Sequence, residues 1–227
     1  MSPDRLLNER LRAAFENLKK IPYFSGAHGD SVDSTLFNKL AEQIKAKKIS
    51  AEAWKKTDAF EPLRRNCQRK IFGFNMMVPE VLIVDKPNGS QNWPDALVIY
   101  KSKGLPIEFK SAGQDKIVWN SGLPQPEGIY IFNGITTRDD QQTTFFLGAA
   151  ILSEVERRVL TSAAAENQDA AKTFNETLIT LDSKWSLYAR PMYNCGDKYL
   201  CHPKRYEREL EVLAYIDSFT WDQLPTP

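Results

Sequence analysis

The sequence lacks several features that would assign the protein to a familiar functional class. No run of residues approaches the roughly 18 consecutive apolar residues of a membrane-spanning helix. The first residues, MSPDRLLNERLRAAF, are charged and amphipathic and contain no apolar signal segment. No glycine-rich phosphate loop of the Walker type occurs, so nothing in the sequence supports nucleotide hydrolysis. We therefore expect a cytoplasmic protein that does not associate with a membrane.

Histidine and cysteine are also scarce, with two and three residues in a chain of 227. Two histidines give little material for a serine or cysteine nucleophile that an imidazole activates, and we expect the cysteines to be reduced thiols. Cys195, Cys201 and His202 lie close together, but their spacing is not that of a common zinc finger, and His28 is far away in the chain. A structural zinc site is therefore disfavoured.

Positive and negative charges are nearly balanced, since the formal net charge is +1. This balance neither requires nor excludes a nucleic-acid partner, and any basic surface must be local. Apolar residues make up 42% of the chain and aromatic residues 11%, which is enough for a sizeable core. Length and composition together predict a single domain over residues 1–227.

Residues 1–75 are predicted to be helical, because apolar residues recur there at helical spacing. The segment DSVDSTLF supplies N-cap candidates just before the second of three expected helices. The three apolar stripes are Leu7, Leu11, Phe15 and Leu18; Leu36, Leu40 and Ile44; and Phe60, Leu63, Cys67, Ile71 and Phe74.

Residues 80–152 are predicted to form a sheet, and residues 153–227 to return mainly to helix. The β-rich runs VLIV, ALVIY, LPIEFKS, GIYIFNG and TTFFLGAAIL are separated by turn-forming segments. An alanine-rich helix, SEVERRVLTSAAAENQDAAKTFNETL, then precedes a strand, KWSLYARPMY, and a helix around KRYERELEVLAYI. The expected fold is α/β, with a mixed central β-sheet flanked by helices from both ends of the chain.

Charged residues interrupt two of the β-rich runs. If ALVIY and LPIEFK form a hairpin around residues 101–104, side-chain alternation places Glu108 and Lys110 on one face, and Asp95 joins them there. Leu105, Ile107 and Phe109 then point into the core on the other face. Buried charges are costly unless they are paired or bound to a metal ion. The sequence therefore predicts a site that contains two carboxylates and one ammonium group.

Two carboxylates supply hard oxygen ligands of the kind that Mg²⁺ prefers. A lysine beside such a metal can orient or deprotonate water, or can stabilise negative charge on a phosphate. The alternative is a cross-strand salt bridge on a solvated face of the sheet.

The spacing of these residues resembles a known nuclease signature. Pro94-Asp95, twelve further residues and then Glu108-Phe109-Lys110 resemble the motif of the PD-(D/E)XK nucleases, of which Type II restriction endonucleases are the best-known members. The resemblance covers about residues 80–135 and implies a restriction-endonuclease-like core. It implies that Asp95 and Glu108 bind Mg²⁺, that the backbone carbonyl of Phe109 adds a ligand, and that Lys110 serves the attacking water.

The activity that this resemblance implies is Mg²⁺-dependent cleavage of double-stranded DNA at specific sequences, leaving 5′-phosphate and 3′-hydroxyl ends. A single site on a chain of this size suggests a homodimer that reads a short palindrome, with one subunit for each strand. Two other functions stay open. One is a repair or recombination nuclease of the same fold, such as a junction resolvase, and the other is a DNA-binding module without catalysis.

A second acid-x-lysine pattern occurs at Asp182-Ser183-Lys184. It follows a polar segment and lacks an apolar strand on both sides. We therefore interpret this second copy as a solvated turn.

Three polar or basic segments are candidate DNA contacts. The segment that follows the expected active strand carries amide and lysine side chains that can read base edges or contact phosphate, together with a tryptophan that could stack; the alternative is an ordinary polar loop with an anchoring tryptophan. Its candidates are Ser111, Gln114, Lys116, Trp119, Asn120 and Ser121. A second possible contact loop contains Tyr193, Asn194, Lys198, His202, Lys204 and Arg205.

The third segment is the basic side of the expected third helix, where Arg65 and Arg69 are the candidate phosphate contacts. Arg64, Gln68 and Lys70 are their neighbours. A merely solvated helix face is the alternative. On the same expected helix, Glu61 is a candidate for an additional acid near the metal.

Overall fold

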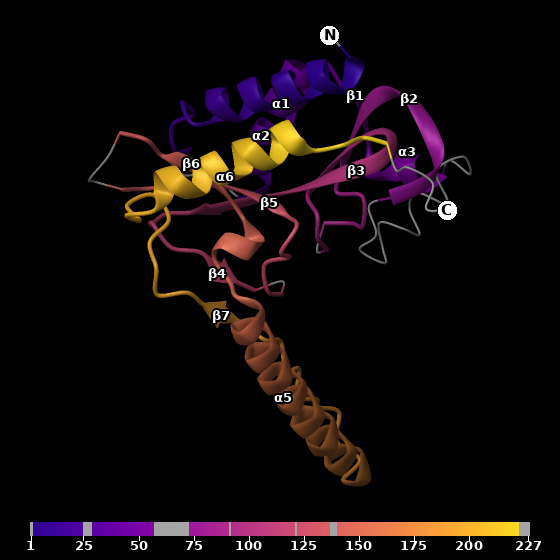
Figure 1. Ribbon diagram of the computed structural model, residues 1–227. Helices are drawn as coiled ribbons and strands as arrows, with labels where there is room; N and C mark the ends of the chain where they lie inside the picture. Colours follow the sequence, from indigo (N-terminus) through magenta and orange to yellow (C-terminus); the bar gives the residue numbers. More distant parts are fainter. Residues whose placement is uncertain are drawn as a thin grey trace.

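A mixed β-sheet lies at the centre of the computed structural model (Figure 1). The structure describes residues 2–24, 29–56, 73–90, 92–120, 122–136 and 140–222. The strands lie in the order β1-β2-β3-β5-β6. β1 is parallel to β2, β2 antiparallel to β3, β3 parallel to β5, and β5 antiparallel to β6. Their bounds are Lys47–Ile49, Gly73–Asp85, Ala96–Ala112, Ile129–Gly134 and Thr143–Leu147. The expected α/β class with a mixed sheet is confirmed.

Strand β3 folds back on itself. The backbone N–H of Phe109 donates a hydrogen bond of 2.9 Å to the Asp95 carboxylate, fourteen positions away in sequence, whereas a straight strand would separate these residues by about 46 Å. Lys101, with φ of 51°, lies where the direction reverses. The outgoing segment, residues 96–101, pairs with β2, and the returning segment, residues 104–112, pairs with β5 through its last six residues. The predicted hairpin around residues 101–104 is therefore confirmed.

Residues from both ends of the chain hold this reversal in place. The Ser102 N–H donates to the backbone oxygen of Trp221 at 3.3 Å, and the Lys101 ammonium lies 2.6 Å from Asp4 and 2.9 Å from Asp222. The Trp221 indole N–H in turn donates to Asn8 at 2.7 Å. The hairpin that carries the candidate site is therefore anchored at its far end.

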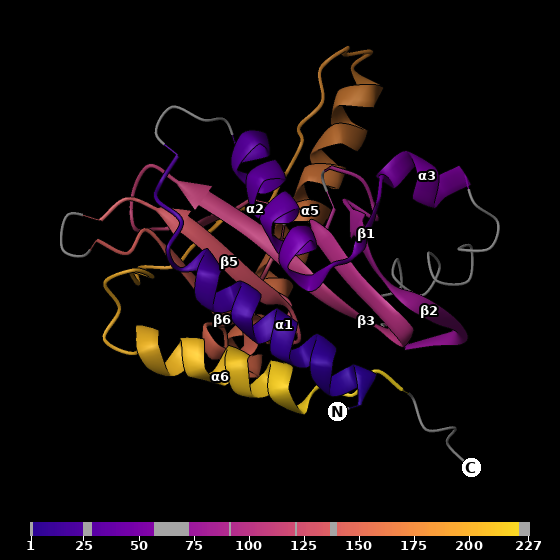
Figure 2. The same ribbon diagram turned by 90° about the horizontal axis from the view of Figure 1, so that it is seen from above.

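Three helices cover one face of the sheet (Figure 2). They are α1 (Pro3–Leu18), α2 (Gly29–Ile44) and α6 (Arg205–Ser218). The Ser2 hydroxyl caps α1 by accepting a hydrogen bond from the Arg5 N–H. The first two apolar stripes that the sequence predicted are buried in this layer, and they pack on the sheet residues that face the helices.

The opposite face of the sheet has two smaller covers. Trp54 of α3 (Ala51–Lys56) packs on β2 and on the outgoing segment of β3. Farther along, β4 (Val118–Trp119) pairs with β7 (Tyr193–Asn194), and Trp119 joins an aromatic cluster on β5 and β6. Both faces are thus buried, as a sheet with long apolar runs requires.

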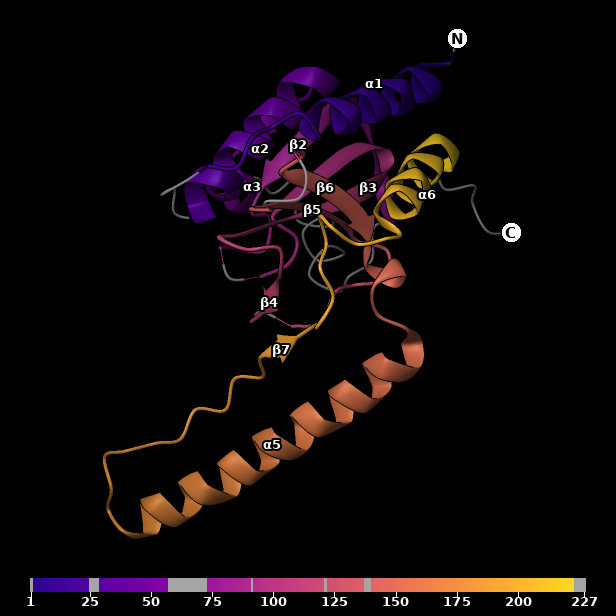
Figure 3. The same cartoon turned by 90° about the vertical axis from the view of Figure 1, so that its left-hand side faces the viewer.

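Helix α5 (Glu154–Thr180) leaves the sheet after a short 3₁₀ turn at Gly148–Ala150 and projects from the body of the molecule (Figures 1 and 3). A capping box starts it, since the Ser153 hydroxyl accepts from the Glu156 N–H while the Glu156 carboxylate accepts from the Ser153 N–H. The chain then runs back along α5 to β7. We call residues 153–194 the projecting arm. The expectation that helices from the C-terminal region flank the sheet is confirmed for α6 and wrong for α5.

Several expected boundaries are corrected. The N-terminal region contains β1 at the sheet edge, and β2 begins at Gly73, so Phe74 belongs to a strand. The segment DSVDS lies within α2, not before it. The expected strand over residues 184–193 is wrong for residues 184–192, which run back along α5 without strand structure (Figure 3); only Tyr193 lies in a strand, the short β7. The expected third helix falls on residues 57–72, which lie outside the described ranges.

Within the described ranges, none of the helices has both the length and the apolar composition needed to cross a membrane.

Candidate active site

The candidate site lies at the open end of the β3 hairpin, beside the end of β2 and away from the turn at residues 101–104. Asp95 precedes the outgoing segment, and Glu108 and Lys110 lie on the returning segment. The Asp95 N–H donates to Glu108 Oε2 at 3.1 Å, and Asp95 Oδ2 accepts from the Phe109 N–H at 2.9 Å. Lys110 Nζ donates to Glu108 Oε1 at 2.7 Å. The structure thus brings together the three residues that the sequence predicted.

Side-chain alternation along the returning segment separates this chemistry from the core. Leu105, Ile107 and Phe109 are buried among the three covering helices, as predicted. Glu108 and Lys110 point to the opposite face, where the rings of Trp119 and Tyr130 border them. The Lys110 ammonium lies 5.7 Å from the centre of the Trp119 ring.

Burial gives both carboxyl groups unusual proton affinity. Burial is the largest cause that raises the pKa of Glu108, to about 7; the Lys110 ammonium opposes the shift and the Asp95 charge adds to it. The pKa of Asp95 is also raised by burial, against the hydrogen bond from the Phe109 amide and the positive charges of Lys110 and Lys86. The two carboxylates therefore repel one another in a poorly solvated place, and a cation there would stabilise their ionised forms.

Asp33 on α2 is a third carboxylate near this site, and the sequence analysis missed it. Burial, followed by the charge of Asp95, raises its pKa to about 7, while Lys86 and Lys110 oppose the shift. Asp33 precedes Phe37, Leu40 and Ile44 at positions of one helical stripe, so an acid stands where an apolar residue belongs. This acid within an apolar stripe was the sequence signal that could have identified Asp33. Glu61, the acid that the sequence suggested for such a role, lies outside the described residues.

The solvated form of the salt-bridge alternative does not fit the structure. The Lys110 and Glu108 side chains are only 18% and 8% exposed, so the pair is largely removed from water. Such a pair costs desolvation free energy that its own attraction does not reliably offset. A function therefore explains the presence of this buried Glu108–Lys110 pair better than a contribution to stability does.

The donor set of the site fits a hard divalent cation. Asp95 and Glu108 offer only oxygen atoms. In the described part of the chain, no three His, Cys, Asp or Glu side chains lie close enough together to hold a metal ion by themselves. Mg²⁺ usually takes only one or two protein carboxylates and completes its shell with water and phosphate oxygens. The carbonyl of Phe109 as a further ligand stays a prediction.

The two loops that the sequence suggested for DNA contact come together in one unit, here called the loop platform and comprising residues 113–120 and 193–204. β4 pairs with β7. The buried Asp115 carboxylate accepts hydrogen bonds from the amides of Tyr199, Leu200 and Cys201 at 2.6–2.9 Å. The sequence analysis did not identify this clamp, which makes two segments distant in sequence into a single surface beside Lys110.

Most candidate contacts on the loop platform are accessible. Gln114, Lys116, Asn120, Asn194, Lys198 and Lys204 are exposed, and Tyr193 and His202 are half-buried, as are Ser111 and Arg205 just outside the platform. Trp119 is only 5% exposed, with its N–H donated to the Tyr199 hydroxyl and its ring against Tyr130. The structure thus supports the anchoring role for Trp119 and not the stacking role. Arg64, Arg65, Gln68, Arg69, Lys70 and Ser121 lie outside the described residues.

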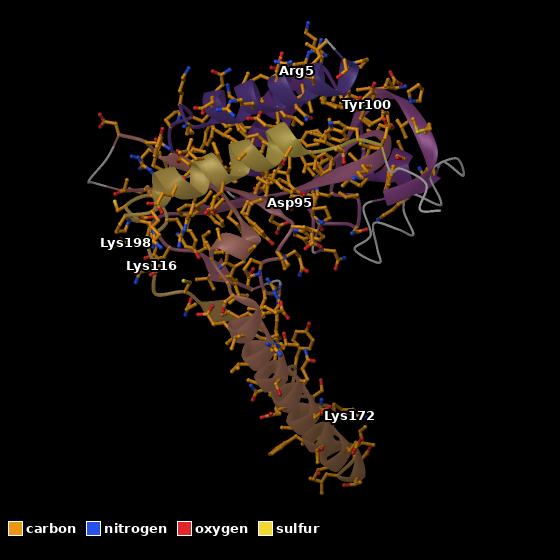
Figure 4. The ribbon with its side chains drawn as sticks, in the orientation of Figure 1. Arg5, Asp95, Tyr100, Lys116, Lys172 and Lys198 are labelled. Atoms are coloured by element: carbon orange, nitrogen blue, oxygen red, sulfur yellow. The ribbon has the colours of Figure 1, made fainter. Side chains whose placement is uncertain are left out.

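Two lysines from different loops line one open cavity of about 450 Å³ on the platform. Lys116 and Lys198 lie side by side at the edge of the body (Figure 4). Gln114 and Thr136 line the same cavity. The buried Asp115 lines it as well, so the charged groups of the cavity are two lysines and one aspartate.

The residues considered for zinc make other contacts. Cys201 Sγ lies 2.7 Å from the Thr136 hydroxyl. His202 Nδ1 accepts from the Lys204 N–H, and Nε2 lies 3.5 Å from Asp197. Cys195 is half-buried near Tyr199.

Comparison with known proteins adds no assignment. No family model matches the chain, and neither a curated protein nor a solved structure is significantly similar to it.

Proposed function

We propose that the protein is a Mg²⁺-dependent endonuclease that cuts double-stranded DNA at specific sequences, as a Type II restriction enzyme does. The observation that carries the proposal is the meeting of Asp95 and Glu108, two carboxyl groups with raised pKa, beside the ammonium of Lys110. Surroundings that push the pKa of several groups away from ordinary values are typical of catalytic sites. The restriction-endonuclease-like core is part of the same proposal.

Each residue of the site has a role in this proposal. Asp95 and Glu108 would hold Mg²⁺, with the Phe109 carbonyl as a further ligand, and a bound Mg²⁺ offsets negative charge on the phosphate in the transition state. Lys110 is positioned by Glu108 and, as an ammonium, orients the water that attacks the phosphodiester in line; it could deprotonate that water only after giving up its own proton, for which the Glu108 carboxylate is the adjacent acceptor. The charges of Asp95 and Glu108 act on Asp33, which would be a third negative charge in the surroundings of the site but is not one of the proposed metal ligands. The products are 5′-phosphate and 3′-hydroxyl ends.

The loop platform is the proposed DNA-contact surface. Its lysines Lys116 and Lys198 suit phosphate oxygens, and the amide side chains of Gln114 and Asn120 suit the hydrogen-bonding edge of a base. Its attachment to the strand of Lys110, through Trp119, supports a role close to the scissile phosphate. The near-neutral net charge is compatible with this proposal, because the exposed Lys116 and Lys198 share one surface.

Cleavage of supercoiled plasmid separates the proposal from its rivals. The assay is run with Mg²⁺ and then with EDTA on several DNAs of known sequence. Discrete fragments that appear only with Mg²⁺ are expected. Cleavage that follows branched structure and not sequence would favour a repair or recombination nuclease such as a junction resolvase. A protein that never cuts any of these DNAs would favour the DNA-binding module without catalysis.

A further inference from the structure

The projecting arm exposes large apolar side chains that the described body does not cover. At its tip Trp185 is 84% exposed and Tyr188 83%, and Phe174 on α5 is 63% exposed. Exposed apolar surface of this extent on one element is unusual for a chain that works alone. The other exposed apolar residues of the arm are Val155, Val159, Ile179, Leu181, Leu187 and Met192.

The root of the same arm borders an apolar groove. A cavity of about 470 Å³ lies between the start of α5 and the loop platform. Its apolar lining includes Trp119, Leu123, Ile151, Val155, Val159 and Tyr199. One chain thus carries an exposed apolar tip and an open apolar groove, which lie about 30 Å apart along α5.

The charge of the arm argues against a nucleic-acid or anionic membrane partner. Residues 153–194 contain six acidic and five basic residues, so the segment has a net charge of −1. A surface that binds phosphate backbones or anionic lipids concentrates positive charge. The arm therefore suits a protein partner.

The exposed stripe on α5 has the same spacing when it is read in either direction. Val155, Val159, Ala163, Glu166, Ala170 and Phe174 follow one another at intervals of four, four, three, four and four positions. An antiparallel copy therefore places Val155 opposite Phe174, Val159 opposite Ala170 and Ala163 opposite Glu166, so the two outer pairs are apolar and the Glu166 carboxylates lie near the middle. Such self-complementarity is the property that a twofold symmetric interface requires.

We propose that the arm is the dimerisation element, and that the α5 helices of two copies of this chain pair antiparallel, so that each tip docks in the groove at the root of the partner's arm. Aromatic side chains can each bury about 150–250 Å². Three of them with their aliphatic neighbours approach the roughly 800 Å² per partner that a standard interface buries. The inference depends on the arm alone and stands whether or not the protein is a nuclease.

The test is the solution mass of the protein without DNA, by sedimentation velocity at micromolar concentration. Val159→Glu and Phe174→Glu place a carboxylate on the exposed stripe. Ala165→Glu places the same group on the opposite side of α5, at another exposed position, and is the matched control. Because all three positions are exposed, the helical circular dichroism of each variant should equal that of the parent.

The parent and Ala165→Glu are expected at about twice the chain mass of 25.9 kDa, and Val159→Glu and Phe174→Glu at the mass of one chain. A parent that stays a single chain would overturn the inference. So would stripe variants that dimerise like the parent, or a control variant that dissociates as they do. Plasmid cleavage is a separate readout, so loss of the nuclease proposal would leave this result unchanged.

Discussion

The chain contains an acid-x-lysine pattern twice, and the two copies lie in opposite surroundings. Glu108 and Lys110 are 2.7 Å apart, on a strand in the body, and are nearly buried. Asp182 and Lys184 are 3.6 Å apart near the tip of the projecting arm, where their side chains are 98% and 91% exposed. The same short pattern therefore marks a candidate site in one place and a solvated turn in the other, as the sequence predicted.

The flanking residues cause this difference. Glu108 alternates with apolar residues that bury their side chains under three helices, so the strand holds the acid in a poorly solvated position. Asp182 follows Leu181, the C-cap of α5, with φ of 53°, and the Ser183 N–H donates to the Leu178 oxygen, as at an ordinary helix end. A motif of three residues thus indicates chemistry only when its neighbours predict burial and a partner strand.

The largest expected effect is on cleavage. Glu108→Ala removes a proposed metal ligand, and Lys110→Ala removes the group beside the attacking water, so each should lower the Mg²⁺-dependent cleavage rate by roughly 100–1,000-fold or more. Asp182→Ala and Lys184→Ala remove the same groups from the exposed copy and should cut at the parental rate. Rates on one plasmid substrate measure all four variants, and duplex binding should persist in each.

A Lys110→Ala variant that cuts at the parental rate would contradict the assignment of this site. Equal losses in the Lys184→Ala variant would show that the comparison of the two copies is mistaken.

A smaller effect is expected on recognition. If the loop platform reads bases, Asn120→Ala should weaken binding to the specific duplex by ~1–3 kcal/mol while binding to random DNA barely changes. Asn38→Ala, on the exposed side of α2, is the control and should change neither affinity. Titration of both duplexes at one salt concentration measures the difference. Equal losses on both duplexes would mean that Asn120 only supports the fold of its loop.

The third expected effect is on stability, and it concerns the carboxylate that the motif does not include. The pKa of Asp33 is about 7 in the folded chain, above its ordinary value near 4, so the folded state binds this proton more tightly than the unfolded state does. The stability that the proton confers is lost as the pH rises from about 4 to about 7. Without metal, the free energy of unfolding of Asp33→Asn should therefore rise relative to that of the parent as the pH increases over this range.

The gain should reach about 1–3 kcal/mol at pH 8, or several degrees in melting temperature, and should be smaller at pH 5. Asp182→Asn, which removes a solvated carboxylate, should follow the parent at both values. Thermal unfolding in EDTA measures this. An Asp33→Asn variant that is less stable than the parent at pH 8 would show that Asp33 makes a favourable contact instead.

Much of the sheet and its site followed from the sequence, for a physical reason. Alternating side chains fix which residues of a strand share a face, so the facing of Leu105, Ile107 and Phe109 away from Glu108 and Lys110 was predictable. Turn residues between two β-rich runs placed the hairpin. The stripes of α1 and α2 were visible because their spacing is regular and their apolar residues are large.

The rest depended on contacts between segments that are distant in sequence. Periodicity shows that α5 has an apolar stripe, but it does not show that the helix projects from the body and leaves the stripe exposed. The proximity of Asp33 to Asp95 depends on how α2 crosses the sheet, and the clamp by Asp115 depends on a loop more than eighty residues away. Neither local propensity nor a short motif contains that information.

The most direct test of the central claim is whether Mg²⁺ binds at the Asp95–Glu108 pair in the absence of DNA. At a Mg²⁺ concentration ten times its dissociation constant, binding to the folded state alone should raise the free energy of unfolding by about 1.4 kcal/mol. Thermal unfolding with Mg²⁺ and with EDTA should show this gain for the parent and for Asp182→Asn, and should show none for Glu108→Gln or Asp95→Asn. Equal stabilisation of all four proteins by Mg²⁺, or of none, would contradict the account.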